Sequence, residues 1–345
     1  MSSALITGCS GFLGQILTRQ LLDRGLDCFG IDLQPCEVKH PRFTFHQGDI
    51  RRDPDLELVF SRTRFDAVFH VAAILAHAVK DRNFLWTSNV DGTRRVAEFC
   101  RNYKIPKLVF TSSNCLWGES LLRPVVEEDV PNPIEIYGRS KWEGEKILLQ
   151  YKDSFDSLII RCPTILEAGR LGLLSILFEF IDEGRKVWVV GDGKNRYQFI
   201  YALDLIDAMV RSLDHNQSAI FGIGSENPGS LEDVYSYVIQ KAHSSSTIAR
   251  LPKNLAIPAM KACYALGISP LGPYHYKMIA EDFCFDTTRI KKTLNWRPTL
   301  TNEEMLYRAY QYYRDNSKEI HSRTTASAHR KAAPMGIIRL LKWLS

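Results

Sequence analysis

Short apolar runs alternate with segments of helical periodicity through the first half of the chain. Apolar runs typical of buried strands occupy residues 3–7, 28–32, 43–47, 66–72, 107–112 and 157–162. Apolar residues at helical spacing predict helices over residues 12–24, 84–104 and 137–151. Strands that alternate with helices in this way indicate an α/β fold, in which a Rossmann-type, doubly wound parallel sheet carries helices on both faces.

The pattern becomes less regular after Pro163. Helices are predicted over 171–183 and 203–214, and strands over 186–193 and 219–225. The residues that follow contain six prolines, at positions 228, 252, 258, 270, 273 and 298. Because proline interrupts both helices and sheets, this density favours a smaller second lobe rather than a continuation of the sheet.

These changes in pattern predict two domains and a tail. Residues 1–163 would form a dinucleotide-binding domain, to which residues 197–225 return. Residues 164–196 and 226–315 would form a smaller α/β substrate lobe. Residues 316–345 are predicted to be a flexible tail that ends in a short, basic, amphipathic segment, "MGIIRLLKWLS".

Composition narrows the class of protein. The 345 residues are 45% hydrophobic and 24% charged, which is typical of a chain with a packed core. The net charge of +5 is mild and no basic run is interleaved with aromatic residues, so nucleic acid is not an expected partner. Eight scattered cysteines without a C-x-x-C pair disfavour a disulfide scaffold or a metal site and fit a reducing, cytoplasmic location. Neither a signal peptide nor a membrane-spanning helix is predicted.

The first candidate site is a glycine-rich loop, "ALITGCSGFLG", between a strand and a helix. Gly8 would permit the tight turn, Gly11 the approach of backbone to a pyrophosphate, and Gly14 the close packing of helix on strand. The pyrophosphate would lie at the helix N-terminus, where free N–H groups and the helix dipole favour an anion. The spacing is G-x-x-G-x-x-G, a relative of the dinucleotide fingerprint G-x-G-x-x-G.

Asp32 ends the second predicted strand, where a carboxylate can accept hydrogen bonds from an adenosine ribose. A carboxylate would repel the additional phosphate of NADP. The sequence therefore predicts NAD as the cofactor in preference to NADP.

Seven motifs in order give the chain a family resemblance: "TGCSGFLG", "GDI", "HVAA", "NVDGT", "TSSNCLWG", "YGRSK" and "FDTTRI…LNWRPTLTNEEM". Between residues 7 and 305 the chain resembles the extended short-chain dehydrogenase/reductases, in their NAD-dependent epimerase/dehydratase branch. The resemblance implies an enzyme, and it implies a homodimer formed through the helices near 84–104 and 137–151.

The resemblance also assigns roles to particular residues. The implied catalytic residues are Ser113, Tyr137 and Lys141, with Asn89 organising a proton relay. The implied cofactor-binding residues are Gly8, Gly11, Phe12, Leu13, Gly14, Asp32, Asp49, Ile50, Ala72, Ala73, Asn89, Tyr137, Lys141 and Pro163. The implied substrate-binding residues are Ser113, Asn114, Tyr137, Arg196 and Gln198. No metal is implied, and we interpret His70 and His77 as packing or loop residues.

The chemistry explains why these residue types occur together. A tyrosine has a pKa of about 10, and a general base works best when its pKa is close to the operating pH. Lys141 lies four residues after Tyr137, on the same helix face, and is expected to lower the pKa of the phenol. Tyr137 could then remove a hydroxyl proton while hydride passes to nicotinamide, and Ser113 would hold the same substrate oxygen.

The substrate is less sharply indicated. Sugar dehydratases of this branch carry an Asp-Glu pair where this chain has Asn114 and Cys115, so dehydration is disfavoured. Epimerisation of a nucleotide sugar, with the cofactor recycled, is our first hypothesis, with net oxidation or reduction beside it. "GDGKN" and the apolar residues 255–272 also resemble the sterol and lipid-alcohol branch, so a lipid-linked sugar or a sterol-like lipophilic alcohol is the alternative.

Two further alternatives remain open. A non-catalytic NAD-binding sensor or scaffold would have no need of both Tyr137 and Lys141, and this chain has kept the pair. The basic amphipathic segment 335–345 suits a helix on a membrane surface, which would place the protein in the cytoplasm and in contact with a membrane. A frayed terminus, or a helix docked on its own lobe, is the competing interpretation of that segment.

Overall fold

The computed structural model describes residues 2–75, 81–269, 272–322 and 342. Its centre is a seven-stranded parallel sheet with the order β10-β6-β5-β4-β1-β2-β3. The strands are β1 (Ser3–Thr7), β2 (Asp27–Asp32), β3 (Phe43–Gln47), β4 (Ala67–His70), β5 (Lys107–Ser113), β6 (Asp156–Cys162) and β10 (Ala219–Gly222). All neighbouring strands pair in parallel, and a helix lies in the connections from β1 to β2, β3 to β4, β4 to β5 and β5 to β6.

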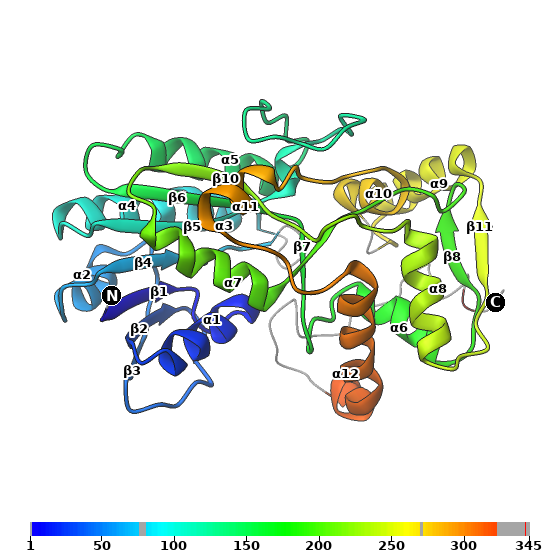
Figure 1. Cartoon of the computed structure of the whole chain (residues 1–345), viewed down its shortest axis with the longest axis horizontal. Coiled ribbons are helices and arrows are strands. Elements are labelled where there is room, and N and C mark those ends of the chain that lie inside the picture. The colour runs from blue at the N-terminus through cyan, green and yellow to red at the C-terminus, as the bar shows by residue number, and fades with distance from the viewer. Residues whose placement is uncertain (1, 76–80, 270–271, 323–341, 343–345) are drawn as a thin grey trace.

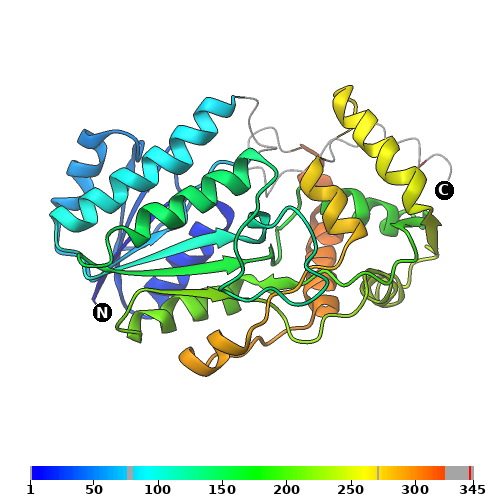
Figure 2. The same cartoon turned by 90° about the horizontal axis from the view of Figure 1, so that it is seen from above.

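Helices cover both faces of this sheet (Figures 1 and 2). Around the sheet lie α1 (Phe12–Asp23), α2 (Asp53–Phe60), α3 (Arg82–Trp86), α4 (Gly92–Asn102), α5 (Ile136–Leu149), α7 (Ala202–Arg211) and α11 (Thr288–Leu294). Short turns are the π-helix η1 (Thr87–Asp91) and the 3₁₀ helices η2 (Asn114–Leu116) and η3 (Ser212–Asp214). One apolar core joins α1, α7 and α11 to the sheet, and another joins α2, α4 and α5 to its opposite face.

The second lobe is built on two small parallel sheets. One pairs β7 (Thr164–Leu166) with β9 (Phe199–Tyr201), and the other pairs β8 (Val187–Val190) with β11 (Ile248–Leu251). Its helices are α6 (Leu174–Asp182), α8 (Leu231–Lys241), α9 (Lys253–Ala265), α10 (Pro273–Ala280) and α12 (Asn302–Ser322). A core around Phe178, Tyr310 and Tyr313 holds α6 and α12 together.

The predicted fold class is confirmed, and the strand order explains where a site should form. Strand β1 lies between β2 and β4, so the chain reverses its direction of progress across the sheet beside β1. Ligands bind at the carboxyl ends of parallel strands at such a switch point. The glycine loop leaves β1 at this end, and the predicted Ser113 terminates β5 at the same end.

Three segments differ from the sequence-based expectation. The predicted helix 84–104 is interrupted by the π-helical turn η1, which local periodicity does not reveal. Helix α12 is kinked at Asn316, the predicted start of the tail, and helical structure continues beyond the kink to Ser322, because Ile320 is buried against the second lobe. Residues 288–296 return to the first lobe, where Trp296 is buried in the core below α1 and α7.

The structure also bears on the expectations about cysteines, metal ligands and membrane-spanning helices. None of the eight cysteines forms a disulfide, and the described residues contain no cluster of His, Cys, Asp and Glu that could hold a metal ion. No helix in the described ranges is long and apolar enough to cross a membrane. Segment 335–345 lies outside the described residues except for Lys342, whose ammonium contacts Glu179 and Glu183.

Candidate active site

The glycine loop has the close packing that a dinucleotide site requires. Gly8 has φ +76°, a left-handed conformation, and an added Cβ would lie 2.6 Å from the backbone of Ala72. A Cβ on Gly14 would collide with the Gly8 carbonyl oxygen. No side chain caps the N-terminus of α1 at Gly11. Backbone N–H groups there can bind a pyrophosphate, so these residues fit NAD.

Asp32 lies at the end of β2, beside this loop. Its carboxylate accepts hydrogen bonds from the Ser10 N–H and the Gln34 N–H, both at 3.0 Å. Burial raises the pKa of Asp32, and these two backbone donors oppose that rise. The carboxylate is thereby fixed where an adenosine ribose would lie.

We expect Asp32→Ala to weaken NAD binding by about ten- to a hundredfold, because a charge-assisted hydrogen bond contributes about 1.5–3 kcal/mol. NADP binding should weaken less, since the variant also removes a charge that repels its extra phosphate. Calorimetric titration with both dinucleotides measures the ratio. Asp27→Ala, at the exposed opposite end of β2, is the control and should leave it unchanged. An unchanged ratio in Asp32→Ala would remove the ribose assignment.

The remaining predicted cofactor residues have the following surroundings. The Asp49 carboxylate pairs with the Arg51 guanidinium, and buried Ile50 packs against Gly92. Ala72 and Ala73 are half-buried after β4. The other three, Phe12, Leu13 and Pro163, line the cavity described next.

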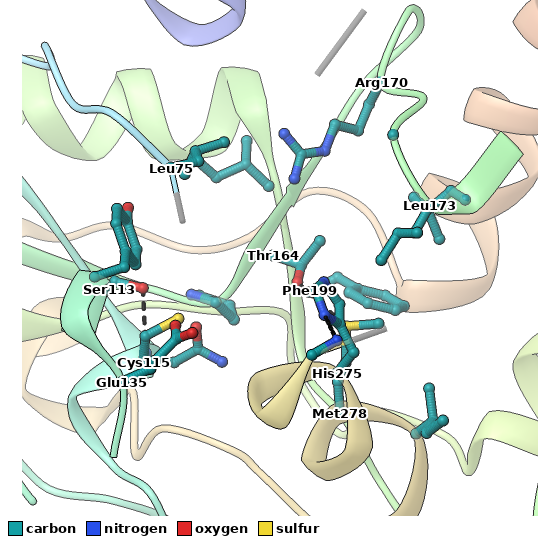
Figure 3. Close-up of a pocket in the computed structure, with 18 of the residues that line it drawn as sticks. Leu75, Ser113, Cys115, Glu135, Thr164, Arg170, Leu173, Phe199, His275 and Met278 are labelled. Atoms are coloured by element: carbon teal, nitrogen blue, oxygen red, sulfur yellow. Dashed lines mark hydrogen bonds between the residues drawn. The ribbon is translucent and has the colours of Figure 1, made fainter. Parts of the chain in front are cut away.

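A cavity of about 1380 Å³ continues from the glycine loop into the second lobe. It exceeds the ~300–1,000 Å³ that is typical of ligand pockets, so it has room for one end of a dinucleotide and for a substrate. Ser113, Cys115 and Glu135 lie on one side of it, Phe199, His275 and Met278 on the other, and Arg170 extends toward the space between them (Figure 3).

Ser113 and Tyr137 both line this cavity, from the end of β5 and the first turn of α5. The Ser113 hydroxyl accepts a hydrogen bond from the Cys115 N–H at 3.1 Å. Because this bond uses the oxygen as an acceptor, the hydroxyl proton can be donated to a substrate oxygen. The hydroxyl and the phenol that the sequence predicts to act on one atom therefore line the same cavity.

Lys141 was expected to lower the pKa of Tyr137, but the protein without a bound cofactor does not show this lowering. Burial raises the pKa of the phenol well above its ordinary value, and Cys115, Cys162 and Glu135 add to the rise. The cation that opposes the rise is the Arg170 guanidinium. Tyr137 is consequently a proton donor at neutral pH, as reduction of a ketone requires, until further positive charge approaches it.

Lys141 is buried one helical turn after Tyr137. Its Nζ lies 4.0 Å from the centre of the Phe110 ring. Burial lowers the pKa of Lys141 to about 8, although Cys162 and Glu145 act in the opposite direction. The charge of this ammonium therefore changes closer to neutral pH than that of an exposed lysine.

The pKa of Lys141 gives stability a defined pH dependence. Between its folded value of about 8 and its ordinary value of 10.5, the unfolded chain binds a proton that the folded chain does not. Stability should therefore rise with pH in this window, by about 3 kcal/mol for this residue. Urea unfolding without NAD measures the free energy of unfolding at each pH. Between pH 8 and 10.5 we expect this free energy to rise by about that amount more in wild type than in Lys141→Met. Exposed Lys146→Met is the control and should follow wild type. A constant difference between wild type and Lys141→Met would contradict the assignment.

Asn89 lies in the π-helical turn and fastens the catalytic helix to the β4 loop. Its amide pairs with both backbone groups of Ile74, at 2.7 and 3.0 Å, and donates to the Ser140 hydroxyl at 3.0 Å. Ser140 in turn donates to the Tyr137 carbonyl at 2.8 Å. π-Helical turns of this kind are frequent at functional sites. Asn89 is thus linked to the Tyr137 backbone through the Ser140 hydroxyl.

A buried charge pair anchors the other end of the catalytic helix. The Arg161 guanidinium donates to both oxygens of the Glu145 carboxylate, with the shortest contact at 2.7 Å. The Ser112 hydroxyl donates to the same carboxylate at 2.5 Å. These side chains link α5 to β5 and β6.

The predicted substrate residues are not all at the cavity. Asn114 lines it and donates to the Tyr197 hydroxyl at 2.6 Å. Arg196 is exposed, and its backbone N–H binds Asp282, whereas Gln198 is buried and pairs with the backbones of Ser225 and Phe285. Neither Arg196 nor Gln198 lines the cavity.

The structure adds cavity residues that the sequence did not single out. Glu135 lines the cavity beside Ser113, and burial raises its pKa. Arg170 lies over the Phe12 ring, 5.8 Å from its centre, near the start of α1. In the sequence, the available signal for Glu135 as a cavity residue was its position two residues before Tyr137. His70 is buried between the Thr7 and Thr93 hydroxyls, which confirms its interpretation as a packing residue.

Comparisons with known proteins agree with this geometry. The family described as "NAD dependent epimerase/dehydratase family" matches residues 4–224. The chain is 33% identical to uncharacterized protein y4nG of Sinorhizobium fredii, over 99% of this chain and 86% of that one. It is 25% identical to UDP-glucose 4-epimerase of Mycolicibacterium smegmatis, over 91% and 99%. It is 24% identical to sterol-4-alpha-carboxylate 3-dehydrogenase, decarboxylating, of Mus musculus, over 91% of each chain.

Solved structures show the same fold. UDP-glucose 4-epimerase of Thermotoga maritima with UDP-glucose superposes with a TM-score of 0.76 at 20% identity, over 91% of this chain and 99% of that one. UDP-glucuronic acid 4-epimerase of Bacillus cereus in complex with NAD gives a TM-score of 0.72 at 23% identity, again over 91% and 99%.

Proposed function

Because this chain belongs to the NAD dependent epimerase/dehydratase family and so uses NAD, we propose that it oxidises a secondary alcohol, or reduces the corresponding ketone, at Ser113, Tyr137 and Lys141. One observation carries the proposal. The Ser113 hydroxyl and the Tyr137 phenol line the same cavity, which opens from the glycine loop at the start of α1.

Each residue has a separate role in the proposed reaction. Held by the glycine loop and Asp32, NAD would supply the hydride acceptor for alcohol oxidation, and NADH the hydride donor for ketone reduction. Ser113 donates a hydrogen bond to the substrate oxygen and orients it. Tyr137 exchanges a proton with that same oxygen, so that the C–H and O–H bonds of the alcohol are replaced by one C=O bond. Lys141 is a buried cation beneath the site, and Asn89 fixes the backbone next to Tyr137.

The proposal is tested with purified protein, NAD and a panel of secondary alcohols and ketones. We expect NADH to form in amounts equal to the ketone produced, and the reverse reaction with NADH and ketone. A Ser113→Ala, Lys141→Met double variant supplies the background rate. Absence of turnover above that background, across the panel and in both directions, would overturn the proposal.

Epimerisation of a nucleotide sugar is a second candidate, because the chain is similar to proteins named UDP-glucose 4-epimerase over nearly their whole length. In that reaction the cofactor is regenerated in each turnover, so NADH does not accumulate. A stereoisomer formed from UDP-glucose without net NADH would support this candidate. Slow net NADH formation with no stereoisomer would reject it.

Two expectations about assembly remain predictions. Helices α4 and α5 lie side by side on one face of the sheet (Figure 2), and we expect them to form a homodimer interface, which sedimentation velocity can test.

Contact of segment 335–345 with a membrane would place a cytoplasmic protein at a lipid surface. Lys342 of this segment pairs with α6, which supports the competing interpretation, a helix docked on its own lobe. Sedimentation with anionic liposomes, before and after deletion of 334–345, distinguishes the two.

A further inference from the structure

The part of the cavity in the second lobe has an apolar wall, and we refer to it as the apolar chamber. Its wall is formed by side chains of α6, β8, α9 and α10, among them Leu174, Leu177, Phe180, Val190, Met260 and Met278. Among the described residues that line the cavity from position 171 to position 279, none is Lys, Arg, Asp or Glu. The chamber is continuous with the end that contains Ser113 and Tyr137.

The charged residues of the cavity wall come from segments outside the chamber, and one of them, Arg170, extends toward the space between Ser113 and Phe199 (Figure 3). Arg82, Glu135, Arg139 and Arg170 all precede the residues of the chamber in the chain. A nucleoside diphosphate brings at least two charges, and burying charge without matched partners is costly. Arg196, the cation predicted to bind the substrate, is exposed and does not line the cavity. The chamber is therefore poorly suited to a diphosphate and well suited to hydrocarbon.

We propose that the apolar chamber binds the hydrocarbon body of a hydroxylated lipid, whose secondary hydroxyl then lies at Ser113 and Tyr137. This inference rests on the proposed oxidoreduction, of which it names the substrate class. The site recognises two chemical features: a secondary alcohol at the polar end, and an uncharged apolar body that displaces water from the chamber.

Helix α9 offers a matched pair of variants. Met260 lines the chamber, whereas Leu255 on the same helix is 67% exposed to solvent. No residue of α9 is fully buried, so a charge at either position should be compatible with folding. Met260→Glu places a carboxylate in the chamber wall, and Leu255→Glu places the same group outside it.

The probes are straight-chain secondary alcohols from butanol to dodecanol, each with its hydroxyl on the second carbon, and uridine diphosphate. Binding to the Tyr137→Phe variant with NAD is measured by calorimetry, and turnover of the wild type by NADH formation. We expect affinity to rise by up to about fourfold per added methylene, which corresponds to about 0.8 kcal/mol. Met260→Glu should flatten this dependence, and Leu255→Glu should keep it. Uridine diphosphate should not compete.

Each outcome separates this inference from the proposed reaction. Affinity that is independent of chain length, or competition by uridine diphosphate, would overturn the apolar chamber as a lipid site. Chain-length-dependent binding without NADH formation would support the chamber and overturn the proposed reaction. Should Met260→Glu lose its thermal transition, Leu177→Asn on α6 provides a second change in the wall, and an unchanged chain-length dependence in that variant would also overturn the inference.

Discussion

Tyr137→Phe should lower turnover by about a hundredfold to ten-thousandfold, the range that a positioned acid or base contributes, and leave NAD affinity nearly unchanged. The phenylalanine ring keeps the shape of the cavity wall and removes only the group that exchanges a proton with the substrate oxygen. Burial keeps Tyr137 protonated in the protein alone, so the loss should be evident in ketone reduction, where the phenol is the donor. Single-turnover oxidation of NADH measures the chemical step directly.

Tyr235→Phe is the matched control for this prediction. Tyr235 also lines the cavity, but it does so from α8, in the second lobe. Removing its hydroxyl should leave turnover within a few-fold of wild type. If the two variants behaved alike, the proton-transfer role of Tyr137 would have to be abandoned.

Glu145→Ala should destabilise the fold by about 3–5 kcal/mol, because it leaves the Arg161 guanidinium buried without its carboxylate. The side chains of both residues are less than a twentieth exposed, at 2% and 4%. The Arg161 contact with the Glu127 carbonyl, at 2.9 Å, cannot replace the lost charge. Urea unfolding monitored by circular dichroism measures the change in the free energy of unfolding.

The exposed pair on the same helix provides the contrast. Glu143 pairs with Lys146, and both side chains are partly exposed to solvent. Glu143→Ala should cost less than about 1 kcal/mol, as surface pairs do. Glu145→Gln, which retains a hydrogen-bonding group, should lie between the two. A cost for Glu145→Ala as small as that for Glu143→Ala would contradict the assignment of a buried pair that holds α5.

The sheet could be predicted from sequence because its strands are buried on both faces. Residues 3–7 and 107–112 contain apolar runs, at 4–6 and 108–110, and each belongs to a central parallel strand. The glycine loop and the Tyr137–Lys141 spacing are local patterns, so the sequence located them as well. Helix α12 extends into the predicted tail because Ile320 finds a partner surface that the sequence does not display.

The apolar chamber could not be predicted from local pattern. Its wall joins elements between α6 and α10 that are separate in the chain, and their apolar residues look like ordinary core positions until the space between them is known. Arg196 and Gln198 show the same limit. The chain passes from exposed at Arg196 to buried at Tyr197 and Gln198, and neither predicted residue faces the cavity, which their position in the sequence does not reveal.

The place of β10 at the edge of the main sheet has a consequence for biosynthesis. When a ribosome has released only residues 1–163, β6 has no neighbour on its outer side, because β10 comes from residues 219–222. An open strand edge invites pairing with other chains. Helix α11 and Trp296, which complete the core on that side, emerge later still. The nascent chain must therefore be protected from aggregation through most of translation, and the dinucleotide-binding half cannot be expected to fold when expressed by itself.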